Sequence, residues 1–482
     1  MEAHSFDDLR DYILEVNSAE PEPGQVDDWE MLPGPHPIHQ LPPEVLSEIF
    51  IECLPAYSAA PNPTRAPMLL AAICRDWREI ALSTPSLWCS FILSVDLVKT
   101  VDGSAVIRLF ETWLSRGGSY PLTMVINGVA SSANYALPAS FILALSQSSS
   151  RWRDVNLMLP LADFYRLQAN EGLTQLKRLS ITATANTAGA DPESPLPPLN
   201  LFSAAPLLQD VCLGYGFSLD NIILSLHQLT YFESRAYAPA AHYLKVACAA
   251  PGLQEIRLNL NTSGTWGRSD AVRSNIKALH LLSMTEKDND ILDCLTCPAL
   301  ETLLIRGFYN PILPQPLTPF HFPGLHRFLA RSSAALRELV LEFPSNLPDA
   351  FVETVQILTA LPSLERLDIQ PLAGNTAQDI FVRMCDSTSM FLPRLRVLTV
   401  QVNVCQIRTS WTYDAMTRML VARWNKQVAK DVEQLQVFTF GFSPVFWASE
   451  FRPFPQPDSA TFEQLEELTR QGMDLELVTV GV

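Results

Sequence analysis

The sequence predicts an α/β protein: a small all-helical module followed by a curved solenoid of short parallel strands and helices. Three observations predict this class. A six-residue pattern of a leucine, two polar residues, an apolar residue, any residue and an apolar residue recurs eleven times after residue 150. Helix-like segments such as FILALSQSSS and FVETVQILTALPS precede the runs that start at 152 and 364. Two amphipathic helical patterns precede the first run, between residues 42 and 82.

The eleven short runs are predicted to be strands that stack on one another. From residue 208 to residue 300 their starts are 21 to 24 residues apart, and elsewhere up to 40 apart, which is typical of one unit with insertions. A period of about 20–29 residues with an L-x-x-L-x-L core is typical of leucine-rich repeats, whose units stack because none buries its apolar face alone. The asparagine ladder of strict repeats is missing, so these repeats are degenerate. The runs are WRDVNL at 152, LKRLSI at 176, LQDVCL at 208, LTYFES at 229, LQEIRL at 253, IKALHL at 276, LETLLI at 300, LRELVL at 336, LERLDI at 364, LRVLTV at 395 and LQVFTF at 435.

The helical module begins with the segment IHQLPPEVLSEIF, whose apolar residues follow a helical period behind two prolines. A second helix is predicted over MLLAAICRDWREIAL, after a proline-rich loop at 55–67, and it ends at Ser83-Thr84-Pro85. A β-like run, SLWCSFIL, follows. A module of roughly 50 residues buries little apolar surface by itself. Its apolar stripe therefore faces either the first repeat or a partner protein.

Together the two helices resemble the F-box. Leu41, Pro42, Glu44, Val45, Leu46, Ile49 and Phe50 fill the first half of the family pattern, and Ile73, Cys74, Arg75, Trp77, Arg78, Ala81, Leu87 and Trp88 fill the second. The long proline-rich loop is similar to that of F-box proteins from mushroom-type fungi. Many of those proteins carry a short coiled coil ahead of the box, and an acidic segment stands there in this chain. The resemblance divides the chain into an acidic disordered tail (1–35), an F-box (36–92), a transition segment (93–150) and a leucine-rich-repeat solenoid with a C-terminal cap (151–482).

The resemblance implies a function as the substrate receptor of an SCF-type cullin–RING ubiquitin ligase. The F-box would dock onto a Skp-type adaptor and through it a cullin, and the repeats would capture an unknown protein substrate. The alternative is a repeat scaffold that binds partners without coupling to ubiquitylation. Trp77 and Ile73 are candidates for packing the two helices together instead of docking. The residues expected to face the adaptor are Leu41, Pro42, Val45, Leu46, Ile49, Phe50, Leu54, Trp77, Leu87 and Trp88.

Substrate capture is expected on the concave strand face, where residues between the buried positions of each run point to solvent. The same residues could also be ordinary solvated strand positions, and their mixed chemistry indicates no particular ligand. The candidates are Asn156, Thr182, Arg257, Asn259, His280, Arg306, Glu342, Asp368, Gln370, Thr399 and Gln401.

Charge and composition favour a reduced, intracellular protein. The net charge is −17, which argues against a nucleic-acid partner. Residues 1–34 hold ten carboxylates against a single arginine, as expected of a solvated tail. Neither a secretory signal nor an apolar run long enough to span a membrane is visible. The nine scattered cysteines fit a cytoplasmic or nuclear location.

No motif indicates an enzyme, a cofactor or a metal site. The sequence lacks G-x-S-x-G, Walker, H-E-x-x-H and G-x-G-x-x-G patterns, so no catalytic residues are expected. Cys294 and Cys297 form a C-x-x-C pair, but no second ligand pair follows at zinc-finger spacing, which favours buried thiols. His321 and His326 are five residues apart, the wrong spacing for two ligands on one helix face, and are expected on the surface or in loops.

Overall fold

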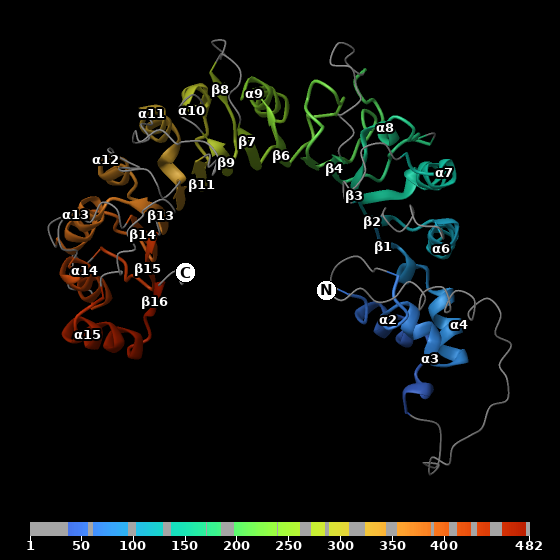
Figure 1. Cartoon of the computed structure of the whole chain (residues 1–482), viewed down its shortest axis with the longest axis horizontal. Helices are drawn as coiled ribbons and strands as arrows, with labels where there is room; N and C mark the ends of the chain where they lie inside the picture. The colour runs from blue at the N-terminus through green and yellow to red at the C-terminus, as the bar shows by residue number, and fades with distance from the viewer. Residues whose placement is uncertain are drawn as a thin grey trace, which may run out of the picture. The chain divides into compact units, whose positions relative to one another are not determined.

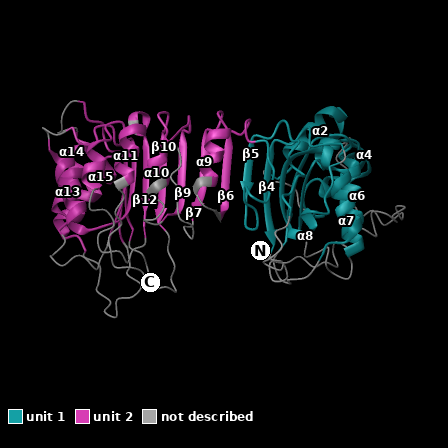
Figure 2. Cartoon of the chain, turned by 90° about the horizontal axis from the view of Figure 1, so that it is seen from above, with its two compact units in different colours: residues 1–225 teal, residues 226–482 magenta. Residues whose placement is uncertain are grey.

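The structure is a computed structural model that describes most of the chain. The described residues are 37–55, 61–94, 103–128, 136–169, 171–184, 197–238, 240–260, 271–284, 289–307, 323–343, 354–386, 390–403, 412–425, 431–443 and 456–478. The acidic tail expected at 1–35 lies outside them. The chain divides into two compact units, Met1–Ser225 and Leu226–Val482 (Figure 2). None of the helices in the described ranges is long and apolar enough to cross a membrane.

The first unit contains the helical module and the first parallel strands (Figure 1). Five strands pair in chain order and are all parallel. Its elements are η1 (Pro37–Gln40), α2 (Pro43–Glu52), α3 (Met68–Ile73), α4 (Arg75–Ser83), η2 (Pro85–Trp88), β1 (Ser90–Ser94), α6 (Gly103–Arg116), β2 (Leu122–Asn127), α7 (Ala139–Gln147), η3 (Ser149–Arg151), β3 (Trp152–Pro160), α8 (Leu161–Phe164), β4 (Arg178–Thr184) and β5 (Asp210–Leu213).

The helical module has one more break than the sequence pattern predicts. The first predicted helix is present as α2, with proline at its start. The second is divided at Cys74, whose extended backbone separates α3 from α4. The Cys74 sulfur accepts a hydrogen bond from the Trp77 amide at 3.5 Å and so caps α4. The guanidinium of Arg78 donates to the Ala71 carbonyl at 2.8 Å and ties the two short helices together.

An aromatic cluster joins the helical module to the first repeat. The Trp88 indole N–H donates to the Ala81 carbonyl at 2.8 Å, and its ring meets that of Trp113 on α6 at 4.9 Å. Phe91 of β1 lies 5.1 Å from Phe110 and continues this cluster along α6. Repeat packing therefore begins directly after the helical module, and β2 adds a strand that the recurring pattern does not reveal.

The second unit is a ladder of parallel strands with helices along one side (Figure 1). The strand order is β6-β7-β9-β11-β12-β13-β14-β15-β16, and β8 pairs with β10 separately. Its elements are β6 (Tyr231–Ala238), α9 (Ala240–Ala249), β7 (Glu255–Leu260), β8 (Val272–Arg273), β9 (Ala278–Met284), α10 (Asn289–Cys294), β10 (Leu295–Thr296), β11 (Thr302–Gly307), α11 (Pro323–Ser332), η5 (Ser333–Ala335), β12 (Glu338–Glu342), α12 (Thr354–Thr359), β13 (Arg366–Leu372), α13 (Gly374–Cys385), β14 (Val397–Asn403), α14 (Asp414–Trp424), β15 (Val437–Ser443), α15 (Ser459–Arg470) and β16 (Asp474–Val478).

All eleven runs predicted to be strands are strands, and the last described elements after them are the helix α15 and the strand β16. Their apolar positions lie in register from strand to strand, as Leu339, Leu367 and Leu398 do on β12, β13 and β14. These three leucines are at most 1% exposed. The recurring leucines therefore form continuous buried rows between strands and helices, which is how a repeat too small to fold alone is stabilised. This confirms the α/β class with stacked parallel strands.

Arginines satisfy the carbonyls that helices leave free at their C-terminal ends. Arg151 donates to the Leu114 carbonyl in the last turn of α6 at 2.9 Å. Arg331 of α11 donates to the Leu292 carbonyl of α10 at 2.8 Å. Each contact joins one repeat to the helix of an earlier repeat.

Arg423 is the most buried of these arginines, with 1% of its surface exposed. From α14 its guanidinium donates to the carbonyls of Met384, Leu392 and Phe391, at 3.1, 3.0 and 2.6 Å. Burial lowers the pKa of Arg423 to about 10, so the side chain remains charged at neutral pH. It therefore fixes the end of α13 and the turn before β14 through a single side chain.

An alternating row of charges runs along the edge of the second unit where the strands begin. Lys277, Glu301, Arg337, Glu365 and Arg396 precede β9, β11, β12, β13 and β14, and the backbone of each bonds to its neighbour in the row. The Lys277 ammonium lies 4.0 Å from the Glu301 carboxylate, and the Arg337 guanidinium lies 3.9 Å from Glu365. Opposite charges thus alternate over these five neighbouring positions of the stack.

Replacement of Glu365 by lysine places three cations in succession in this row. We expect the melting temperature to fall by about 2–4 °C at low salt, because two attractive contacts become repulsive. The difference should shrink in 1 M NaCl, which screens exposed charges. The control is Glu466→Lys, an equal charge change at an exposed position of α15. Equal shifts for both variants would contradict the proposed role of the row.

Candidate functional site

The ten residues expected to face an adaptor differ in burial: four are buried, three are half-buried and three are exposed. Leu46, Phe50, Leu87 and Trp88 are at most 4% exposed. Phe50 packs on Trp77 inside the helical module, and Trp88 packs on Trp113 of α6. Leu41, Leu54 and Trp77 are half-buried, and Pro42, Val45 and Ile49 are exposed. The four buried side chains cannot touch a partner in this conformation.

The exposed apolar side chains of the helical module point away from its core. On α2, Val45 and Ile49 are 44% and 37% exposed and lie one turn apart. On α3, Leu69 and Ile73 show the same spacing with 41% and 52% exposure. Ile73, a candidate for internal packing, is therefore on the surface. Leu82 of α4 completes the set at 38%. Five large apolar residues exposed within so small a module are typical of a protein-interaction surface.

Trp77 lies at the boundary between core and surface. Its ring packs on Phe50, with 4.8 Å between the ring centroids. Its indole N–H is buried and has no hydrogen-bond partner among the described residues. Trp77 thus packs against the buried side of α2. Its contact with Phe50 stabilises the turn of α2 that exposes Val45 and Ile49.

The residues expected to capture a substrate lie on the strand side that the helices do not cover, called the open strand face below. Alternating burial places them there in each unit, and none of the eleven is fully buried. Asn156 and Thr182 belong to the first unit, on β3 and β4. The other nine belong to the second unit, where register pairs Arg257 with His280 and Asp368 with Thr399.

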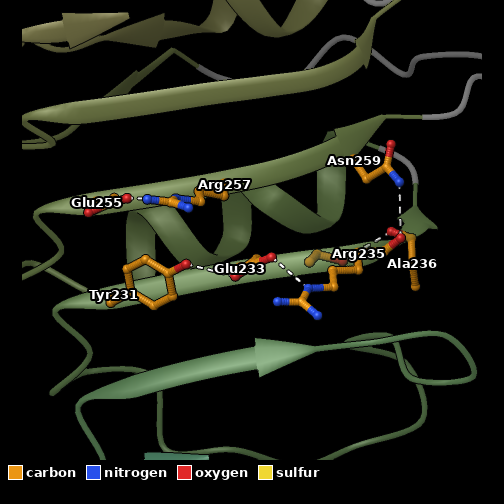
Figure 3. A network of polar contacts seen from close by, with 8 residues as sticks. Tyr231, Glu233, Arg235, Ala236, Glu255, Arg257 and Asn259 are labelled. Atoms are coloured by element: carbon orange, nitrogen blue, oxygen red, sulfur yellow. Dashed lines mark hydrogen bonds and ion pairs between the residues drawn. The ribbon is translucent and has the colours of Figure 1, made fainter. Parts of the chain in front are cut away.

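A polar network covers the start of the open strand face of the second unit (Figure 3). The Tyr231 hydroxyl donates to Glu233 at 2.7 Å, and the Arg235 guanidinium donates to the same carboxylate at 2.7 Å. Arg257 donates to Glu255 at 2.7 Å and lies 5.7 Å from the centre of the Tyr231 ring. Every charge in this network thus has an opposite charge or a hydroxyl against it.

The same network shifts the titration of its members. Burial alone would raise the pKa of Glu233, but the hydrogen bonds from Arg235 and Tyr231 outweigh it and lower that pKa. Burial and the nearby Arg257 guanidinium lower the pKa of His280, so this imidazole is neutral at pH 7. The side-chain amide of Asn259 donates to the Arg235 carbonyl at 3.0 Å, and the Oδ1 atom of the same amide is buried with no partner among the described residues.

Further along the face, on β11 to β13, ion pairs cross between neighbouring strands. Arg306 pairs with Glu342, and Arg366 lies 3.4 Å from Glu338. Asp368 differs, because in the part of the chain that the structure describes its carboxylate accepts a hydrogen bond only from Gln370, at 2.7 Å. Burial, with Glu342 nearby, raises the pKa of Asp368.

Gln401 follows on β14, and its Cγ lies near Gly441 of β15. The sequence patterns did not indicate the partners Tyr231, Glu233, Arg235, Glu255, Glu338 and Arg366. They occupy the same alternating positions, and that alternation was the signal that could have found them.

The described residues contain no group of three histidine, cysteine or acidic side chains placed to hold a metal ion. Cys297 is fully buried, which raises the pKa of its thiol to about 12, whereas Cys294 is half-buried. His326 is exposed on α11, as expected for a surface residue. His321 lies outside the described residues.

The chain was compared with known proteins at the levels of family and of sequence. No protein-family model matches it, and no curated protein matches it in sequence.

Proposed function

We propose that the chain is an F-box substrate receptor of an SCF-type ubiquitin ligase. In this proposal the helical module docks onto a Skp-type adaptor, and the open strand face captures a protein substrate. The observation that carries the proposal is the α2 sequence pattern of the F-box together with the exposure of Val45 and Ile49 on that helix. The chain would act by holding a substrate close to the conjugating enzyme, through effective concentration, and would perform no chemistry itself.

The fold supports this division of roles. Trp88 anchors the helical module to α6, and the exposed apolar side chains available to a partner are Val45, Ile49, Leu69, Ile73 and Leu82. On α2, Leu46 and Phe50 of the amphipathic stripe are buried, whereas Val45 and Ile49 are exposed, which supports a role for this part of the stripe in binding a partner. A scaffold that binds the adaptor without promoting ubiquitylation would use the same surface.

Co-purification with a Skp-type adaptor tests the docking. We expect Val45→Asp/Ile49→Asp to weaken adaptor binding roughly 30- to 1000-fold, because central apolar contacts of an interface contribute about 2–4 kcal/mol. The matched control is Glu44→Gln/Glu48→Gln, which changes exposed residues with the same spacing on the same helix. Circular dichroism should show that both variants keep the fold.

Failure of the unaltered chain to bind the adaptor would refute the docking proposal. Adaptor binding without recruitment of a cullin would favour the scaffold. Proximity labelling in cells with and without a proteasome inhibitor would identify the substrate.

A further inference from the structure

The last four strands of the second unit share one row of side chains on the open strand face. Register places Asp368 of β13 beside Thr399 of β14, Thr399 beside Thr439 of β15, and Thr439 beside Glu476 of β16. The two middle members are short, and the residues that precede them on the same face, Val397 and Val437, are short as well. Two carboxylates therefore bound a stretch of small side chains.

The cations of the open strand face in this unit are already engaged. Arg306 pairs with Glu342, and Arg366 lies 3.4 Å from Glu338. In the network at the start of the face, Arg257 lies 2.7 Å from Glu255.

The carboxylates near the last strands differ from those arginines. Within the described ranges no lysine or arginine lies within 4.0 Å of Asp368, Asp474 or Glu476. Among the described residues, the charges at the start of the face are thus paired, whereas Asp368 on β13 and Asp474 and Glu476 on β16 have no cation within ion-pair distance.

Of these three carboxylates, Asp368 would gain most from a nearby cation, because its surroundings disfavour its charged form. It is half-buried, and Gln370 is its one hydrogen-bond donor among the described residues. Glu342 and Glu338 add negative charge nearby, and Arg366, which is paired with Glu338, offsets part of it. Its raised pKa means that the folded chain holds its proton more tightly than the unfolded chain does. Ionisation of Asp368 at neutral pH therefore opposes folding, and a bound cation would relieve this cost.

We propose that the row from Asp368 to Glu476 binds an extended segment of a partner protein through basic side chains. The proposal rests on the function proposed above, in which this face captures the substrate, and it specifies the substrate as one with a basic, extended segment. Three strand spacings of about 4.8 Å separate β13 from β16, so the two carboxylates lie roughly 14 Å apart. Residues i and i+4 of an extended chain are separated by about the same distance. Lysines or arginines four residues apart would thus meet Asp368 and Glu476 together, above the threonines.

Fluorescence anisotropy of labelled peptides on the full chain tests this. The probes are two serine-based nonapeptides with two lysines each, spaced i, i+4 in one and adjacent in the other. We expect the i, i+4 peptide to bind more tightly, and Asp368→Asn/Glu476→Gln to weaken it about tenfold. The control, Glu463→Gln/Glu466→Gln, removes the same charge from exposed positions of α15 and should change binding less than twofold.

Equal weakening by both double variants, or no binding of either peptide, would overturn the proposal, since general attraction to an acidic chain would then suffice. Equal affinity for the two peptides would overturn the assignment of the row. Adaptor co-purification with Asp368→Asn/Glu476→Gln separates this inference from the proposed function. An unchanged adaptor signal with unchanged peptide binding would refute only the basic-segment proposal. Peptide binding that depends on the row in a chain that binds no adaptor would refute only the ligase role.

Discussion

Replacement of Trp88 by alanine is expected to destabilise the first unit by about 3–5 kcal/mol, among the largest effects of any single substitution in this chain. The side chain is 1% exposed, donates to the Ala81 carbonyl, and meets the ring of Trp113. The guanidinium of Arg116 lies 4.5 Å from the centre of its ring. The variant loses the transfer free energy of the indole, leaves a cavity and frees a buried carbonyl.

Hydrogen exchange measured by mass spectrometry checks this prediction. Amide protection should fall first in α2, α3 and α4, because Trp88 bonds to Ala81 of α4 and packs on Trp113 of α6. The control is Leu82→Ala on α4, where the side chain is 38% exposed and less than about 1 kcal/mol is expected. Trp88→Ala should also reduce adaptor binding, but with loss of structure, unlike Val45→Asp/Ile49→Asp. Unaltered protection in α2 would show that the module is held by other contacts.

Replacement of Arg423 by methionine is expected to destabilise the second unit by on the order of 3–5 kcal/mol. Methionine fills much of the space but donates no hydrogen bond, so the carbonyls of Met384, Phe391 and Leu392 lose their donor. A buried acceptor left unsatisfied costs about 1–3 kcal/mol. For a unit of this size we expect a fall in melting temperature of about 10 °C, measured by calorimetry.

Arg418 on the same helix provides the comparison. Its ion pair with Asp414 is exposed on both sides, and Arg418→Met should change stability by less than about 1 kcal/mol. Arg423→Lys should behave nearly as badly as methionine, since one ammonium group cannot reach three separate carbonyls with the planar fork of a guanidinium. A mild effect of Arg423→Met would mean that water replaces the lost donors.

The recurring pattern was sufficient to predict the repeats because a strand and its buried face are local in sequence. Leu367 and Ile369 alternate with Asp368 within a single run, and that alternation alone specifies which side is core. The pattern did not predict β2, because LTMVIN lacks a leucine three residues before its first buried strand position. The role of Arg423 could not be predicted either, because its partner Met384 lies 39 residues earlier in the chain. Contacts of that range have no signature in a short pattern.

The same limit applied to the helical module. An amphipathic stripe shows that Val45, Leu46, Ile49 and Phe50 share a side of α2, but the width of the stripe exceeds the width of the core it meets. The division between buried Leu46 and exposed Val45 depends on where α4 crosses α2, which helical periodicity does not encode. The open strand face was predictable as a set of positions, whereas its charge pairing depends on which strands become neighbours.

In the second unit, the in-register pairing of neighbouring strands does not depend on how many residues connect them. β11 and β12 pair residue for residue although their runs start 36 positions apart, and β14 and β15 do so at 40. All the strands are parallel, so every connection leaves from the edge at which the strands end. Residues gained there alter neither the buried leucine rows nor the charge row at the opposite edge. This edge can therefore change in length and composition during evolution while the stacked strands remain the same.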